Sequence, residues 1–324
     1  MSGPRKLLIC LTGFMLVLAS APASANPFII EAPPDTASFT GSFSLRYWYG
    51  MGSTGKDLYD TTGSTLPSRL TYDNLQTHAL EGVIRIDHSS GLFWKGYVGG
   101  ALITAGSLND EDFPPGISPY SSTLSNLNQQ TLGYASIDVG GALLRGPDFR
   151  IDAFVGYHYL DERLKAFGCT QIATNPDVCQ PTVSDTVAVI AQENTWQALR
   201  IGINADLPLI DRLRLNVDAA FLPYVWMSGT DSHLLRIGTA PGDFTGPIPE
   251  DGTGWGYQLD AVLSYRLDEH FSLGVGGRYW HEQASGDAHF ENRVVGFYTA
   301  PQRVDWKTVH YGVFLQGTYV FDPF

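Results

Sequence analysis

Apolar side chains recur at every second position along most of the chain after Ser38, which is the spacing of a β-strand and not of a helix. The segment from Tyr257 to Leu267 shows this most clearly, because its odd positions are apolar and most of its even positions are polar. Residues 199–207 and 271–279 have the same register. A soluble β-sandwich would alternate in the same way, so the connections between the strands have to decide the class of protein.

These connections alternate between short and long. The joins after the second, fourth, sixth and eighth predicted strands are tight turns, whereas the other five span roughly 15 to 30 residues. Bacterial outer-membrane barrels show this asymmetry, with short periplasmic turns and long external loops. We therefore predict an all-β fold, a single closed antiparallel transmembrane barrel of about ten strands. The expected strands cover residues 38–53, 70–87, 92–108, 132–145, 148–165, 194–208, 212–228, 254–267, 270–283 and 308–321.

The first 25 residues have the pattern of a secretory signal peptide. Arg5 and Lys6 supply the positive region, residues 7–19 the apolar stretch, and Ala23-Ser24-Ala25 a small-residue cleavage site. No later apolar run approaches the roughly 20 residues of a transmembrane helix, so membrane insertion would have to use strands. We expect the mature outer-membrane barrel to cover residues 26–324.

The composition argues against one class of binding partner. The formal net charge of −13 argues against nucleic acid, whose phosphates attract basic proteins. The same charge is compatible with attracting cationic peptides to an acidic mouth. Charges of both signs at the lumen positions, such as Glu81 and Arg278, are expected to pair across a narrow interior. The seven tryptophans are interpreted as anchors at the membrane interface.

Cys169 and Cys179 lie in one polar segment of the expected mature chain. In an exported protein such a close pair favours a disulfide that clamps an external loop. The alternative is a metal site, but the pair has no nearby histidine or third cysteine to complete a ligand set. No metal or other cofactor is predicted.

Two acidic motifs lie where predicted strands run into long loops. Asp110-Glu111-Asp112 follows the third strand, and carboxylates this close raise one another's proton affinity unless solvent screens them. Asp231-Ser232-His233 follows the seventh strand. An aspartate two residues before a histidine can orient the imidazole as a general base requires. The sequence thus offers an acid pair that faces an Asp–His pair.

At these two positions the chain resembles the omptins, a family of ten-stranded outer-membrane endopeptidases. Their site joins an Asp-x-Asp at the outer end of the third strand to an Asp-x-His at the outer end of the seventh. The aromatic residue and Pro-Gly that follow in the family are echoed by Phe113 and Pro115-Gly116.

The resemblance implies a mechanism and a substrate class. His233, paired with Asp231, would activate a water that lies between it and Asp110 and Asp112. That water would attack the carbonyl of an exposed peptide segment without a covalent intermediate. The alternative is a non-enzymatic surface barrel that serves as a scaffold, an adhesin or a narrow channel.

The chain departs from the family pattern at two positions. Omptins that cut between basic residues carry an acid two positions before the Asp-x-His aspartate, where this chain has Gly229. An acid on the first strand also has no clear counterpart, although Asp57 is close. The resemblance therefore does not imply cleavage at Arg or Lys.

The register of the seventh strand imposes a structural condition on the site. Simple alternation from Leu213 would carry Asp231 and His233 to the outer face of the barrel. A β-bulge, which we place at Pro223, must shift the register if both side chains are to face inward.

A second resemblance lies on the fifth predicted strand. Omptins bind lipopolysaccharide partly through a Tyr-x-Glu-x-Arg stretch, which here reads Tyr159, Asp161 and Arg163. Alternation points all three side chains outward, at the level of the lipid headgroups. The resemblance implies contact with lipopolysaccharide and leaves open whether activity requires it. An ordinary interfacial girdle is the alternative.

Overall fold

The computed structural model describes residues 38–113, 118–128, 130–238, 243–292, 297–298 and 301–323. The expected signal peptide, residues 1–25, and the Pro115-Gly116 pair lie outside the described residues.

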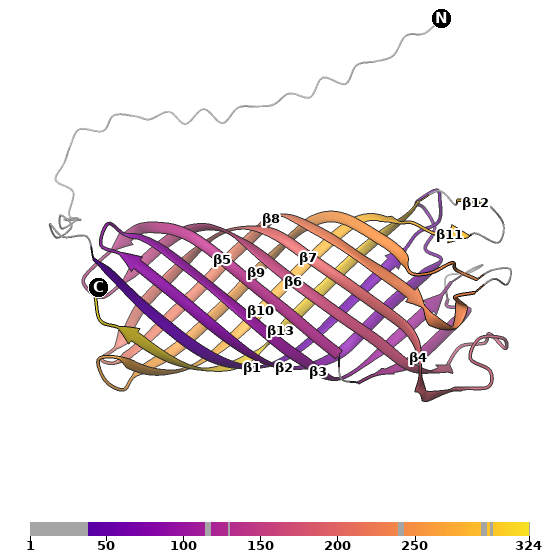
Figure 1. Cartoon of the computed structure of the whole chain (residues 1–324), viewed down its shortest axis with the longest axis horizontal. Coiled ribbons are helices and arrows are strands. Elements are labelled where there is room, and N and C mark those ends of the chain that lie inside the picture. The colour runs from indigo at the N-terminus through magenta and orange to yellow at the C-terminus, as the bar shows by residue number, and fades with distance from the viewer. Residues whose placement is uncertain are drawn as a thin grey trace, which may run out of the picture. The chain divides into compact units, whose positions relative to one another are not determined.

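Long antiparallel strands make up most of the described chain (Figure 1). One short 3-10 helix, η1 (Leu234–Arg236), follows the eighth strand. Within the described ranges, no helix is long and apolar enough to cross a membrane. The strands are β1 (Phe39–Leu58), β2 (Ser68–His88), β3 (Leu92–Asp112), β4 (Ser121–Leu127), β5 (Gln130–Arg145), β6 (Arg150–Gln171), β7 (Val183–Ile210), β8 (Leu213–His233), β9 (Ile248–Arg266), β10 (Phe271–Ala288), β11 (Glu291–Asn292), β12 (Phe297–Tyr298) and β13 (Gln302–Phe321).

The main sheet closes on itself. β1 pairs with β2 on one side and with β13 on the other, and all pairings around the ring are antiparallel. β4 and β5 both lie between β3 and β6, so together they form one interrupted strand. The predicted barrel of ten strands is therefore confirmed. β11 and β12 form a separate two-stranded sheet.

The connections separate the two ends of the barrel. The tight turns and the C-terminal end of β13 lie at one end (Figure 1). The connections at the other end are shorter than the sequence predicts, because the strands continue beyond their predicted limits. These outer connections are residues 59–67, 113–120, 172–182, 234–247 and 289–301.

The outward face carries the surface expected of a membrane barrel. Apolar side chains such as Leu80, Val98 and Leu315 are more than half exposed there. A transmembrane strand needs only about 9–11 residues, whereas β1 has 20 and β7 has 28. The strands therefore continue well past a belt of outward aromatic rings. The belt consists of Tyr47, Tyr49, Tyr157, Tyr159, Tyr224, Trp226, Trp255, Tyr257 and Tyr311.

The interior is filled by paired charges and aromatic rings. Arg278 lies between Glu81 and Asp260, with N–O distances of 2.6 and 2.7 Å. Arg200 pairs with Asp138 at 2.8 Å. The predicted pairing across the lumen is thus confirmed. The interpretation of every tryptophan as an interfacial anchor is wrong, because four are buried inside the barrel and pack in its core: Trp48, Trp196, Trp280 and Trp306.

Candidate functional site

β8 carries the Asp231–His233 motif, and an irregularity at Pro223 turns this motif into the barrel. The pairing of β8 with β9 shifts its register between Leu222 and Val225. Both side chains are fully buried, so the inward face changes from even to odd positions there. Asp231 is consequently only 3% exposed. The bulge that the sequence requires at this position is confirmed.

β3 contains a second register shift, which simple alternation does not predict. Its pairing with β2 is irregular opposite residues 73–77. Ile103 and Leu108 are both fully buried, although an odd number of positions separates them. Asp110 and Asp112 therefore continue the inward face that begins again at Leu108. Without this shift the two carboxylates would point away from β8.

Two residues fit the backbone of this second shift. Asn74 on β2 has a φ of 54°, in the left-handed region that asparagine tolerates better than most side chains. Gly106 on β3 lies where a Cβ atom would come within 2.9 Å of the Leu75 side chain. A larger residue at 106 would have to displace Leu75.

The Asp231 carboxylate lies between the side chains of His233 and Lys56. Its Oδ1 atom is 3.4 Å from Nδ1 of His233, and its Oδ2 atom accepts a hydrogen bond of 2.8 Å from Nζ of Lys56. Burial acts to raise the pKa of Asp231, but the nearby His233 and Lys56 outweigh it and lower that pKa. Asp231 is therefore held ionised beside the imidazole.

Asp110 and Asp112 approach the same histidine from the opposite wall. Burial raises the pKa of Asp110 to about 6, against an opposing effect of His233 and with further increases from Asp112 and Asp231. Burial also raises the pKa of Asp112, and His233 again opposes the shift. His233 thus acts electrostatically on all three carboxylates.

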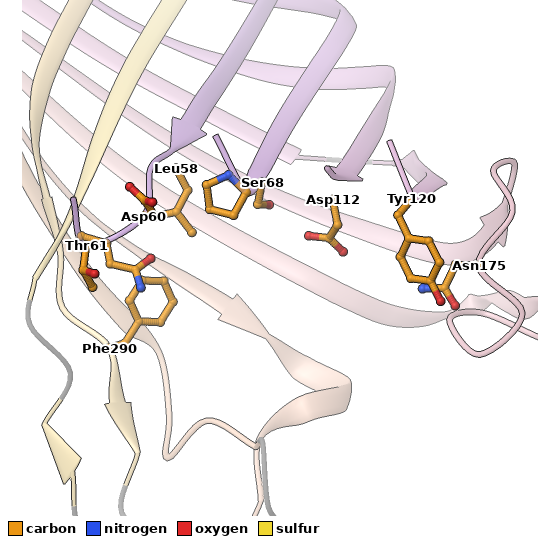
Figure 2. Close-up of a pocket in the computed structure, with 10 residues that line it drawn as sticks. Leu58, Asp60, Thr61, Ser68, Asp112, Tyr120, Asn175 and Phe290 are labelled. Carbon is orange, nitrogen blue, oxygen red and sulfur yellow. The ribbon is translucent and has the colours of Figure 1, made fainter. Parts of the chain in front are cut away.

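A cavity of about 580 Å³ opens beside this cluster, between four of the outer connections (Figure 2). Asp112 is the candidate residue that lines it, next to Ser68 and Tyr120. The other lining residues are Leu58, Asp60, Thr61, Pro67, Asn175, Phe290 and Gln302. Asp60 is largely committed to its own loop, because its Oδ1 atom accepts hydrogen bonds from residues 62, 64 and 65.

Aromatic side chains connect the histidine to this cavity. The ring of His233 lies 5.4 Å from that of Phe244, which lies 6.0 Å from that of Phe290 on the cavity wall. Arg236 of η1 stacks over Phe244 at 4.6 Å. One side of the cavity is therefore apolar and reaches the imidazole.

Beneath the cluster lies a buried network that the sequence predictions missed. Lys56 is 7% exposed, and its Nζ atom donates hydrogen bonds to Asp231, Glu250 and Gln192. Burial alone would lower the pKa of Lys56, but Asp231 and Glu250 reverse the effect and raise it. Alternation along β1 could have placed Lys56 on the inward face, because Tyr49 points outward seven positions earlier.

Comparison with solved structures identifies the fold. The chain superimposes on the outer membrane protease OmpT of Escherichia coli with a TM-score of 0.71 and 15% identity, over 88% of this chain and 97% of that one. It has an omptin-like outer-membrane β-barrel fold. Barrels of Pseudomonas aeruginosa, a FadL homologue and OprG, match at 11% identity over 88% and 87% of this chain and 90% and 96% of theirs, with TM-scores of only 0.29 and 0.31. No family model and no curated sequence matches the chain. The protein is located in the bacterial outer membrane.

The structure shows what occupies the two positions that depart from the omptin pattern. A Cβ atom at Gly229 would lie 2.3 Å from the backbone oxygen of Glu193, so an acidic side chain has no room there. Glu250 on β9 is the residue paired with Gly229, and its carboxylate binds Lys56. Asp57 instead forms a bidentate ion pair with Arg69 on β2, at 2.6 and 3.0 Å.

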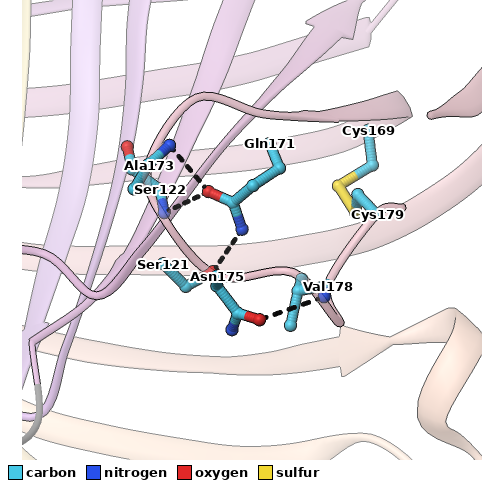
Figure 3. Close-up of a disulfide and its surroundings, with 8 residues drawn as sticks. All are labelled: Ser121, Ser122, Cys169, Gln171, Ala173, Asn175, Val178 and Cys179. Carbon is cyan, nitrogen blue, oxygen red and sulfur yellow. Dashed lines mark hydrogen bonds between the residues drawn. A yellow bond between two sulfur atoms is a disulfide. The ribbon is translucent and has the colours of Figure 1, made fainter. Parts of the chain in front are cut away.

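Cys169 at the end of β6 is joined to Cys179 by a disulfide, with a Cα–Cα distance of 5.7 Å (Figure 3). Gln171 fastens the same loop, because its side chain bonds to Ser121 and to the backbone of Ser122 (Figure 3). Asn175, which lies between the two cysteines in the sequence, lines the cavity. Among the described residues, no group of three or more His, Cys, Asp or Glu side chains could hold a metal ion.

The residues proposed for lipopolysaccharide lie on the outer face of β6. Tyr159 belongs to the aromatic belt, and the Arg163 side chain is 62% exposed. Asp161 pairs with Arg163 at 3.0 Å and also accepts a hydrogen bond from Thr195. The intervening Glu162 points inward and binds His310. The outward direction expected for the three side chains is therefore observed.

Proposed function

We propose that this barrel is an endopeptidase that hydrolyses exposed peptide segments at the bacterial surface. The observation that carries the proposal is the placing of Asp231 and His233 on one wall and of Asp110 and Asp112 on the other, after a register shift in each strand. Two strands that each depart once from regular alternation, and so bring charged side chains to one cleft, are typical of a functional site.

The four side chains can divide the chemistry of hydrolysis between them. Asp231 faces Nδ1 of His233, which leaves Nε2 free to accept a proton from a water in the cleft. The oxygen of that water forms a bond to the peptide carbonyl carbon, while Asp110 and Asp112 hold the water by hydrogen bonds. The proton then passes from His233 to the amide nitrogen as the C–N bond breaks. The separation of 3.4 Å between Asp231 and His233 is long, as is common before a substrate closes such a site.

The position of the cleft suits a macromolecular substrate. It opens at the end of the barrel that carries the long connections, where a peptide segment of a surface or extracellular protein can enter. A chain with a formal net charge of −13 favours the approach of segments rich in Lys and Arg. Attraction at a distance does not decide which bond is cut.

Outer-membrane lipid is the second partner that we propose. Tyr159 and Arg163 on β6 would contact the glucosamine phosphates of lipopolysaccharide, with Asp161 orienting the guanidinium. The support is their outward direction next to the aromatic belt. Bound lipopolysaccharide would stiffen the outer part of β6, which leads into the loop that contains Asn175.

The proposed function is tested with the refolded barrel, lipopolysaccharide and a library of quenched fluorescent peptides. Hydrolysis by the wild-type protein that His233→Ala abolishes supports an endopeptidase. Absence of hydrolysis by both proteins would leave a non-enzymatic surface barrel, acting as a scaffold, an adhesin or a narrow channel. Equal hydrolysis by both proteins would contradict the role of His233.

A further inference from the structure

Lys56 is a buried cationic side chain of the protein that lies among the carboxylates of the site. It extends from β1 into the interior, and all three hydrogens of its ammonium group have acceptors, on Asp231, Glu250 and Gln192. Glu250 is held further by Trp306 and Gln192 on its second oxygen. No hydrogen of the Lys56 ammonium group is left over, and the oxygen of Asp231 that Lys56 does not bind faces Nδ1 of His233.

This arrangement is the one that a basic side chain of a substrate would require. Two buried carboxylates and an amide oxygen around one ammonium group satisfy both its charge and its hydrogen bonds. A second ammonium or guanidinium group at the same place would be repelled by the first, which already holds an oxygen of Asp231, Glu250 and Gln192.

The same lysine acts on the reacting pair. Asp231 shares its charge between Lys56 and His233, so Lys56 keeps the carboxylate ionised while limiting how strongly it favours protonated imidazole. Other charges also face this pair, and they stay in place when Lys56 is changed. They belong to Asp110 and Asp112 on β3, Glu250 on β9 and Arg236 on η1. The phenol of Tyr72 on β2, which is uncharged, also lies near Asp231.

The open cavity beside Asp231 and His233 is more apolar than the surroundings of Lys56. The cavity next to Asp112 has apolar or aromatic walls at Leu58, Pro67, Tyr120 and Phe290. Phe244 continues the aromatic wall from Phe290 to His233. An apolar side chain of a peptide would bury these walls.

We propose that Lys56 is an internal counter-ion that holds Asp231 for His233 and occupies the acidic floor of the cleft, so that the protein cleaves beside apolar or aromatic residues and rejects Lys and Arg at the scissile bond. This inference rests on the proposed endopeptidase function. Lys56 is a positioning and specificity-determining residue and takes no part in bond making.

The test compares wild-type protein with Lys56→Ala in lipopolysaccharide-containing micelles, with cleavage sites in a peptide library identified by mass spectrometry. The control is Lys307→Ala, because Lys307 lies opposite Gly55 in the ladder, one position from Lys56, and is exposed. The wild-type protein and the control should cut beside apolar or aromatic residues. Lys56→Ala should raise cleavage next to Lys about tenfold or more relative to those sites, because it exposes two unpaired carboxylates.

Two further readouts separate positioning from a structural role. Lys56→Ala removes a positive charge from beside Asp231, so the acid limb of the kcat profile should move to higher pH. Propylammonium, which replaces the missing part of the side chain, should reverse this displacement, whereas 1-propanol should not.

The outcomes distinguish this inference from the proposed function. Wild-type cleavage that requires His233 but occurs mainly beside Lys or Arg would overturn the role of Lys56 and leave the endopeptidase intact, and it needs no variant to fold. An unchanged cleavage and pH profile in folded Lys56→Ala would overturn it equally. Absence of any peptide cleavage by the wild-type protein would remove the proposed function and this inference together.

Discussion

Leu222 and Val225 both point into the barrel although they are three positions apart on one strand. Their partners on β9, Gly256 and Gly254, are only two positions apart. β8 therefore contains one residue more than β9 in this stretch. A β-bulge of this kind reverses the direction of every later side chain. It is the reason why Asp231 faces the lumen.

This relationship predicts opposite results for two single-residue deletions. Deleting Pro223 removes the extra residue and leaves Asp231 inward, so activity should persist within a few fold. Deleting Ser228, in the regular part of β8, should turn Asp231 and His233 outward and reduce peptide hydrolysis by about 10²-fold or more. Heat-modifiable migration on gels would show that both barrels fold. Comparable activity in the two variants would contradict the register assigned to β8.

Asp110 predicts a pH-dependent contribution to stability. Its pKa is about 6 in the barrel, mainly because of burial, and is therefore raised from the value near 3.9 of the unfolded chain. A raised carboxyl pKa means that stability is greatest when the group is protonated and is lost as pH rises from about 4 through 6. Asp110→Asn should thus be more stable than the wild type at pH 8 by about 1–2 kcal/mol, after allowance for solvent screening. The gain should vanish near pH 4.

Urea unfolding in detergent micelles at several pH values measures this difference. Glu111→Gln is the matched control, because Glu111 lies between the two aspartates on the other face of β3. A constant difference between Asp110→Asn and wild type across the pH range would show that Asp110 is not buried beside other carboxylates.

The barrel itself could be predicted because the bilayer imposes a strict alternation where the strands cross it. The outer parts of the strands could not, because no lipid contacts them and both faces can be polar. β7 shows the difference, since it begins at Val183 although alternation indicates a start only near residue 194. The pairing of β4 with β3 was missed for the same reason, in a segment dominated by serine and asparagine.

The sequence also predicted part of the candidate site. The motif residues could be named because Asp-x-Asp and Asp-x-His occur at particular strand ends. The bulge on β8 could be inferred because simple alternation from Leu213 would point Asp231 and His233 outward, whereas the shift at Gly106 depends on how Leu75 packs against β3. Lys56 was overlooked because a single lysine near a loop is usually solvated, and its burial depends on partners from three other strands.

The disulfide predicts a local effect. Replacing both Cys169 and Cys179 by Ser should leave the barrel folded but loosen residues 172–182, because the crosslink closes that loop and no other part of the chain. Limited proteolysis should cut this loop about tenfold faster in the variant, consistent with the loss of a crosslink that closes a short segment. Thiol labelling of folded wild-type protein before reduction would contradict the disulfide.

The outer wall of β6 predicts selective binding of lipopolysaccharide. Arg163→Ala should weaken binding of lipid A to the folded barrel by about tenfold, since each lost charge-assisted hydrogen bond removes on the order of 1.5 kcal/mol. Arg214→Ala is the control, because Arg214 also pairs with an aspartate but lies near the tight turns at the other end of the barrel. Fluorescence titration with labelled lipid A gives both affinities. Equal weakening in the two variants would point to a general effect of charge.

The most direct test of the whole account is the rate of peptide hydrolysis by His233→Ala, measured beside wild type and Glu111→Gln with lipopolysaccharide present. The loss of a positioned general base should reduce kcat by about 10²–10⁴-fold while the barrel stays folded, and Glu111→Gln should remain within a few fold of wild type. Cleavage by His233→Ala at the wild-type rate would contradict the assignment of this cluster as a hydrolytic site.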